Sequence, residues 1–591
     1  MKRVCLVLTT ILAISTFDIS AVLYAKDPVT AISTDERPVR EDPIIIATPI
    51  AKKGNFFMDM FKDNLGMPKT TKIEETGFLF NSLPFETIQA RVSESESFHR
   101  NEVLPYLLKS PEMIDCMKLR RTARQIKSQV FSEKVKNSTK LSEDEKGKII
   151  SFLTQQIDSP LVVFDKDPFE SSISIGGGPC MMPVGVEVLN KRFFSDKRVV
   201  LETSVVCALD MKSFLGNTLF SLKDAMTNDT LDLVLCHEVA HSIMFDMYGR
   251  NFSKLRRVSD NGHDTCYITD MRLAFSEGWA EAFEALYGPS NPKFLEKDRK
   301  KYNISDFLFS RQNPIRKDNY VWVKPTGKTT GVTKNGLQLL STEGVIAGLF
   351  YDILTNRAIV GGFEKSIKTM LSAQPQNFKE FLQEYVKLFP EDKKVVYRIF
   401  LESTNYVTMS KEVQPVYSKY FQAKMDFFHK KISQGDIASA KQAFISVKEK
   451  LFARAMEGAD IFENVGPQLW FIGLPKPEKK SLFGIKDAIN KRFGTNVEMK
   501  AQPFILDLNT VTSKMLCNAG FPEDLAEKVI HERTKCGFFT GNALDSLKKV
   551  LGEKIYGAVE KKVELTEYTL YENLSFEKQL LSYWPEDMEK M

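Results

Sequence analysis

The sequence predicts an α+β protein, because a short run of strand-like segments is followed by a much longer run of helical ones. β-Branched residues separated by turn formers predict strands at 161–164, 172–175 and 199–206. Helical spacing of apolar residues precedes these strands at 111–156 and dominates from about residue 230, for example at 342–354, 378–388 and 411–456.

Composition is that of a globular chain of more than one domain. The chain has 591 residues, of which 43% are hydrophobic and 27% charged, so it can bury a large core. With 81 basic and 76 acidic side chains, its formal net charge is +5. That near balance gives no reason to expect nucleic acid or an anionic membrane as the partner.

The N-terminus has the pattern of a secretory signal peptide. Lys2 and Arg3 precede an apolar run over 4–14, and small residues lead to a cleavage position after Ala25. We therefore expect residues 1–25 to direct export to the periplasm or the extracellular space. The apolar run is too short to span a bilayer well, so no stable membrane anchor is expected.

Changes in composition divide the remaining chain into five segments. Residues 26–110 are a polar, proline-containing lead-in, and whether they form a removable pro-segment is open. The main domain is expected over 111–460, followed by a linker over 461–502. A separate unit is expected over 503–563, with a tail over 564–591. The sparse cysteines lack Cys-x-x-Cys spacing and predict no disulfide framework.

The strongest motif is His237-Glu238-Val239-Ala240-His241, which lies in a predicted helix between cap candidates at 228–230 and Gly249. Residues four apart share a helix face, so His237 and His241 can bind one Zn²⁺ ion together. Glu238 is rotated by about 100° from His237 and can hold a metal-bound water without ligating the metal. The chain has only six histidines, which makes a chance match rare.

A catalytic zinc ion needs a third protein ligand and one position left for water. The sixth residue after His241 is Met247, which excludes the zincin pattern that has a third histidine there. A second amphipathic helix is predicted over 275–286, with Glu277 and Glu281 one turn apart on one face.

The segment Ser276-Glu277-Gly278-Trp279-Ala280-Glu281, together with the histidine motif, resembles the gluzincin metallopeptidases over about 199–288. The resemblance implies a zincin-like fold, Glu277 as the third zinc ligand, and Glu281 as the residue that orients a zinc histidine. The interval between His241 and Glu277 is about twice as long as in the best-known members. His263 within it is a competing ligand, and Glu281 is a further alternative.

The resemblance implies a secreted zinc metallopeptidase that acts on a protein or peptide substrate. Glu238 would be the general base, and the side chain that stabilises the oxyanion is left open among three candidates. These candidates are His263, Tyr267 and Tyr302. Segment 199–206 is either an edge strand to which a peptide adds or an ordinary core strand. A non-catalytic exported scaffold that holds a metal is the alternative, and the intact Glu238 favours the enzyme.

Two carboxylates also lie in the apolar helix predicted over 342–354, Glu343 and Asp352. These carboxylates either support the metal site or belong to a helix that only packs in the core. The apolar residues around them favour the second interpretation.

Segment 503–563 resembles the tandem helix-hairpin-helix module of bacterial DNA-uptake receptors, through Asp507-Leu508-Asn509-Thr510 and the hairpin before Leu525. The resemblance implies a small all-α domain. Such hairpins bind phosphate through backbone amides at a helix N-terminus. Here Pro522 removes one amide, and Glu523 and Asp524 add negative charge at that point. We therefore expect protein contacts or packing from this unit and not DNA binding.

Overall fold

The computed structural model describes most of the central part of the chain. The residues described are 44–53, 86–92, 99–164, 184–189, 199–204, 222–227, 231–255, 265–266, 268–287, 317–323, 329–428, 431–466, 469–473, 504–511, 513–518, 521–536, 539, 548–549, 552 and 563–567. Helices predominate among them and small sheets complete the fold, so the chain belongs to the α+β class. The predicted signal peptide, residues 1–25, lies outside the described residues.

The largest sheet has five strands in the order β3-β1-β2-β4-β5. The strands are β1 (Ile44–Lys53), β2 (Glu86–Val92), β3 (Leu161–Phe164), β4 (Val184–Leu189) and β5 (Val199–Ser204). Pairs β1–β3 and β2–β4 are parallel, whereas β1–β2 and β4–β5 are antiparallel. Strand β3 has the predicted bounds and β5 falls inside the predicted 199–206, while 172–175 is not among the described residues.

Two strands of this sheet come from the interval 26–110, which was expected to be an extended lead-in. Ile44 of β1 is paired with Leu161 of β3, and both side chains are buried. Strand β2 pairs with β1 on one side and with β4 on the other. Removal of residues 26–110 would therefore take two neighbouring strands from the middle of the sheet.

Helices α4 (Pro111–Lys136) and α5 (Glu143–Ile157) occupy the predicted helical stretch 111–156. The Ser110 side chain accepts a hydrogen bond from the Met113 amide, and Pro111 fits the first turn, so α4 begins there. Ser142 and Glu145 form a reciprocal capping box that starts α5.

Helix α4 packs along α8 (Leu231–Tyr248), the helix that carries the histidine motif. Arg124 Nε of α4 lies 2.7 Å from Asp246 Oδ2 of α8, and both side chains are almost completely buried. Burial by itself favours the neutral acid, but the charges of Arg124, Lys127 and Arg120 hold the pKa of Asp246 below its usual value. This ion pair fixes the C-terminal half of α8 against α4.

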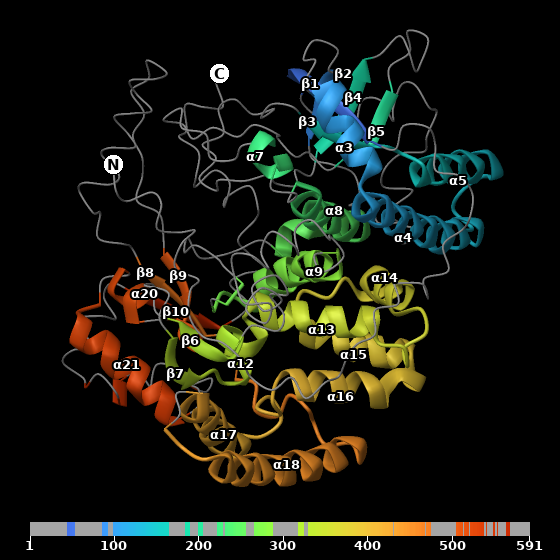
Figure 1. The fold of residues 1–591 in the computed structure, drawn as a ribbon. Helices are drawn as coiled ribbons and strands as arrows, with labels where there is room; N and C mark the ends of the chain where they lie inside the picture. Colours follow the sequence, from blue (N-terminus) through green and yellow to red (C-terminus); the bar gives the residue numbers. More distant parts are fainter. Residues whose placement is uncertain are drawn as a thin grey trace, which may run out of the picture.

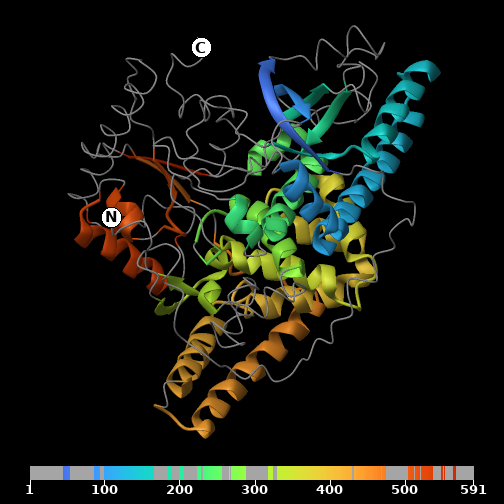
Figure 2. The ribbon, with the colours of Figure 1, turned by 45° about the horizontal axis from the view of Figure 1, so that its top comes forward.

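Helices α8 and α9 (Met271–Tyr287) lie between the five-stranded sheet and a layer of helices that follows them in the chain (Figure 1, Figure 2). That layer contains α13 (Glu343–Thr355), α14 (Gly362–Ala373), α15 (Phe378–Leu388) and α16 (Lys393–Ser403). Aromatic side chains join the layers, with the Phe350 ring 5.1 Å from Trp279 and 5.1 Å from Phe381 between centroids. The histidine motif and the Glu277 motif are thus carried by helices that lie between the sheet and the helical layer.

The predicted helix over 411–456 is two helices, α17 (Val413–Phe428) and α18 (Gln434–Met456). Ser433 caps α18 through a second reciprocal capping box with Asp436, which accounts for the separate start. The shorter elements are α3 (Leu104–Lys109), α7 (Leu222–Thr227), α12 (Gly336–Leu340), β6 (Val321–Val323) and β7 (Thr329–Thr333). Short helical segments of other types occur at His99–Val103, Gly249–Leu255, Lys317–Tyr320 and Pro390–Asp392.

The C-terminal unit differs from the all-α domain that was expected. Its helices α20 (Ser513–Asn518) and α21 (Glu523–Cys536) accompany a three-stranded antiparallel sheet. That sheet is made of β8 (Leu469–Gly473), β9 (Phe504–Asp507) and β10 (Val563–Glu567), in the order β10-β8-β9. The predicted linker supplies the central strand, β8, and the predicted tail supplies most of the outer strand β10. Strand pairing thus joins segments that are far apart in the sequence.

The residues of the hairpin motif make internal contacts in this unit. The side-chain amide of Asn509 donates a hydrogen bond to the Phe539 carbonyl at 2.9 Å and accepts one from the Phe539 backbone N–H at 2.7 Å. The Arg533 guanidinium is buried and donates to the Leu508 carbonyl at 2.7 Å. Gln338 of α12 donates to the Asn509 carbonyl at 3.3 Å, so the start of the unit packs against the helical body. Most of the second hairpin lies outside the described residues.

None of the helices in the described part of the chain is both long and apolar enough to cross a membrane.

Candidate metal site

Helix α8 is buried along almost its whole length, because it packs against both α4 and α9. It ends at Tyr248, and Gly249 has a φ of 54°, the left-handed conformation that favours glycine after a helix. The predicted N-cap positions 228–230 are not among the described residues. His237 and His241 are thus two imidazoles in a buried helix, where polar atoms need partners.

The structure brings His237, His241 and Glu277 together. His241 Nε2 lies 3.1 Å and His237 Nε2 3.5 Å from the same oxygen, Glu277 Oε2. One ligand atom from each residue can be chosen so that all lie within 4.8 Å of one another. Two imidazole nitrogens and one carboxylate oxygen around one point are a ligand set that zinc accepts.

The charges at this point favour a cation. Burial alone would lower the pKa of His237, but the hydrogen bond to Glu277 and the charges of Glu284 and Glu238 outweigh it and raise that pKa to about 10. The His241 charge and the hydrogen bonds from both histidines overcome burial and hold the pKa of Glu277 well below its usual value. The site therefore retains positive charge beside Glu277, which a divalent metal ion can supply in place of a proton.

Glu238 follows His237 directly and its side chain is only 7% exposed. Its charge is among those that raise the pKa of His237, so the carboxylate lies close enough to the histidine to interact with it. This position, beside the ligand set without being part of it, fits a group that holds a water molecule.

Helix α9 carries two further carboxylates after Glu277, those of Glu281 and Glu284. Glu281 Oε1 accepts a hydrogen bond from Thr265 Oγ1 at 2.8 Å, and burial and the charge of Glu284 raise the pKa of Glu281 to about 8. Glu284 Oε1 lies 3.6 Å from His237 Nδ1. Glu284 is not among the residues predicted for the site from the sequence, although residues seven apart return to the same face of a helix.

The loop before α9 is attached to the start of α13. The Gly344 amide donates to the Thr265 carbonyl at 2.8 Å, and the Thr269 amide donates to the Ser341 carbonyl at 2.7 Å. The buried Lys334 ammonium donates to the Cys266 carbonyl at 2.7 Å. These bonds fix the Thr265 hydroxyl against Glu281. The other candidates from this part of the chain, His263, Tyr267 and Tyr302, lie outside the described residues.

The carboxylates of α13 have different surroundings. Glu343 is 1% exposed, and its charge contributes to the raised pKa of Glu281, so it belongs to the neighbourhood of the site. Asp352 lies on the side of α13 that meets α16, where the Ser403 hydroxyl is 3.5 Å away. Burial raises the pKa of Asp352 to about 6.

Gly278 and Trp279 explain why α9 can lie between two other helices. A Cβ on Gly278 would lie 2.6 Å from Ile346 Cβ and 2.9 Å from the Glu343 carbonyl oxygen, so only glycine allows α13 this close. On the other side, Trp279 is fully buried and its indole N–H donates to the Ala240 carbonyl of α8 at 2.9 Å. Gly278 and Trp279 thus set the position of the helix that carries Glu277.

We expect Gly278→Ala to destabilise the protein by about 1–3 kcal/mol, the usual cost of overpacking, because the added methyl meets a Cβ and a backbone oxygen. We also expect weaker zinc binding, since α9 must move and Glu277 moves with it. Urea unfolding and a zinc titration measure the two effects. Gly147→Ala is the matched control, because Gly147 lies in α5 with nothing within 4 Å of the new Cβ. Equal stability of the two variants would contradict the packing argument.

Cys236 is fully buried between α4 and α8, with its sulfur 3.8 Å from Met113 Sδ. It points to the helix interface and serves as a small apolar residue there.

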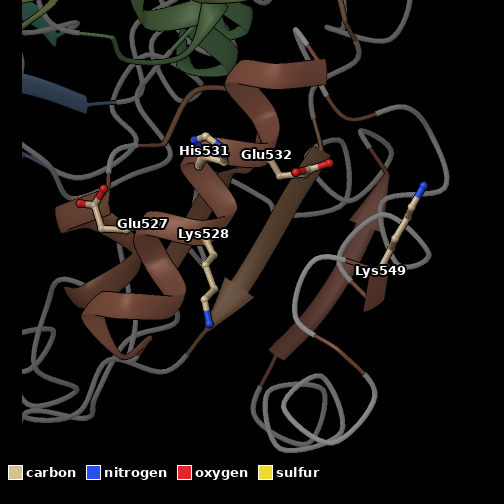
Figure 3. Close-up of a pocket in the computed structure, with 5 residues that line it drawn as sticks. All are labelled: Glu527, Lys528, His531, Glu532 and Lys549. Atoms are coloured by element: carbon tan, nitrogen blue, oxygen red, sulfur yellow. The ribbon is translucent and has the colours of Figure 1, made fainter.

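A hollow of about 550 Å³ lies on the C-terminal unit (Figure 3). Its lining contains side chains of both charges, and four of the five belong to α21. The lining residues are Glu527, Lys528, His531, Glu532 and Lys549. It includes none of the metal-site residues, and in the described part of the chain its His and Glu side chains do not form a cluster of metal ligands.

Comparison of the chain with protein-family models, with curated proteins and with solved structures found no match.

Proposed function

We propose that this protein is a zinc-dependent metallopeptidase in which His237, His241 and Glu277 hold Zn²⁺ and Glu238 is the general base. The observation that carries the proposal is the meeting of both histidine Nε2 atoms at one oxygen of Glu277, which comes from a different helix. The gluzincin resemblance of the two motifs, and hence a zincin-like fold, agrees with this arrangement.

The position of β5 supports a peptide substrate. This strand is at one end of the described strand order β3-β1-β2-β4-β5, it runs antiparallel to β4, and it contacts α8. An edge strand has unpaired backbone groups to which an extended peptide can add. A peptide bound there would lie along the side of the sheet that faces the histidine helix.

In the proposed reaction, bound zinc would lower the pKa of a water molecule and polarise the scissile carbonyl. Glu238 takes the proton from that water and delivers it to the leaving amine. The two histidines and Glu277 keep their places because α8 and α9 are fixed by α4, α13 and Trp279. His263, Tyr267 and Tyr302 are the candidates for the oxyanion donor.

We also propose that the chain is exported through residues 1–25, and that the C-terminal unit makes protein contacts and not DNA contacts. The acidic first turn of α21, with Glu523 and Asp524, supports the second proposal because it repels phosphate. The internal use of Asn509 and Arg533 agrees with a packing role.

The test is the zinc content of the chain from residue 26 onward, measured by elemental analysis, together with its hydrolysis of casein. We expect about one zinc ion per chain, loss of hydrolysis when a chelator removes it, and recovery when one equivalent of zinc is restored. Absence of zinc after purification in zinc-containing buffer would overturn the proposal. Tightly bound zinc without hydrolysis of any protein substrate would favour the exported metal-binding scaffold.

A further inference from the structure

We infer that Glu284 is the positioning residue for His237, in the place that the family resemblance gives to Glu281. The inference rests on the proposed zinc site and adds to it the carboxylate that orients one of its ligands. It is carried by the geometry around the second nitrogen of the His237 ring.

The chemistry of a ligating imidazole requires such a partner. His237 faces Glu277 and His241 through Nε2. A neutral imidazole that binds a metal through Nε2 carries its proton on Nδ1, and a buried N–H needs an acceptor. The Nδ1 atom of His237 is buried and has no hydrogen-bond partner among the described residues, while Glu284 Oε1 is 3.6 Å away. This distance is about 0.4 Å longer than the upper end of the usual range for an N–H···O hydrogen bond.

Glu281 is engaged elsewhere. Its Oε1 atom accepts the Thr265 hydroxyl at 2.8 Å, and Thr265 is fixed to α13 through the Gly344 amide. This bond occupies one of the two carboxylate oxygens of Glu281. In the pair formed by His237 and Glu284, the glutamate is the more exposed, with 29% of its side chain exposed against 16% for the histidine. Its carboxylate is therefore less confined by packing than a fully buried one.

The arrangement places one carboxylate of α9 beside each nitrogen of the His237 ring. Glu277 and Glu284 are two turns apart, roughly 10 Å along α9, and His237 of α8 lies between them. Because both carboxylates belong to α9, the ring orientation depends on the register of α9 against α8. That register is set by Gly278 and Trp279.

The test compares the zinc dissociation constants of Glu284→Ala, Glu284→Gln and Glu281→Gln, measured by competition with a chromogenic chelator. We expect Glu284→Ala to weaken zinc binding by about 10–100-fold, the usual effect of losing such a partner. Glu284→Gln keeps an oxygen acceptor and should recover most of the affinity. Glu281→Gln should change the affinity little. Thermal unfolding of the chelator-treated variants shows whether each one folds.

A second readout is the visible spectrum of the cobalt-substituted chain. Reorientation of His237 in Glu284→Ala should change the ligand-field bands, whereas Glu281→Gln should leave them as in the wild type. Unchanged zinc affinity in Glu284→Ala, or a loss confined to Glu281→Gln, would overturn the assignment. Failure of the wild-type chain to bind zinc would overturn the proposed function and this inference together. Zinc binding without peptidase activity would refute only the proposed activity, and the affinities would still decide between Glu284 and Glu281.

Discussion

Glu238→Gln is expected to lower kcat/KM for peptide hydrolysis by about 10²–10⁴-fold while the chain keeps its zinc. Glutamine has nearly the same shape and can still hold a water molecule, but it cannot take the proton. Glu238 is 7% exposed, so a substitute of the same shape is needed to preserve the packing around it. Since Glu238 is not one of the three ligands, the change to Gln should leave the ligand geometry intact.

The measurement is hydrolysis of a fluorogenic peptide or casein, with zinc content determined on the same preparation. Glu143→Gln is the matched control, since its side chain is 90% exposed at the start of α5. Retention of full activity by Glu238→Gln would remove this residue from the mechanism. Loss of zinc along with activity would show that Glu238 supports the metal site and leave its role as base without support.

Glu277→Ala is expected to weaken zinc binding by roughly two to four orders of magnitude. Apparent binding free energies for structural zinc are about 10–16 kcal/mol, so one ligand of three corresponds to roughly 3–5 kcal/mol. The variant also removes the carboxylate that both histidines share, at 3.1 and 3.5 Å. A zinc titration by chelator competition measures this change.

The alternative ligands are tested in the same series. His263→Ala should bind zinc like the wild type if Glu277 is the third ligand. Near-wild-type affinity in Glu277→Ala, with a large loss in His263→Ala, would assign the third position to the histidine. A loss in neither variant would contradict a site with three protein ligands from this set.

The sequence by itself predicted the parts of this protein that depend on local interactions. The bounds of β3 and α15 follow from runs of β-branched residues and from helical periodicity. The chelating pair His237 and His241 follows from helix geometry alone, because residues four apart lie on one face wherever the helix is placed. The Glu277 motif was identified by its resemblance and its helical context, so this candidate ligand too was identifiable before the fold.

Only the tertiary structure decided which distant segments meet. Strands β1 and β2 join the five-stranded sheet. Strand β9 of the unit expected to be helical shares a sheet with β8 from the expected linker and with β10, most of which belongs to the expected tail, because strand pairing depends on partners far away in sequence. Glu281 and Glu284 share the face of Glu277, and their spacing does not tell which one approaches His237. That choice depends on Thr265, on the close approach of α13 at Gly278 and on the bond from Trp279 to α8. These are contacts between separate elements, and helix periodicity carries no information about them.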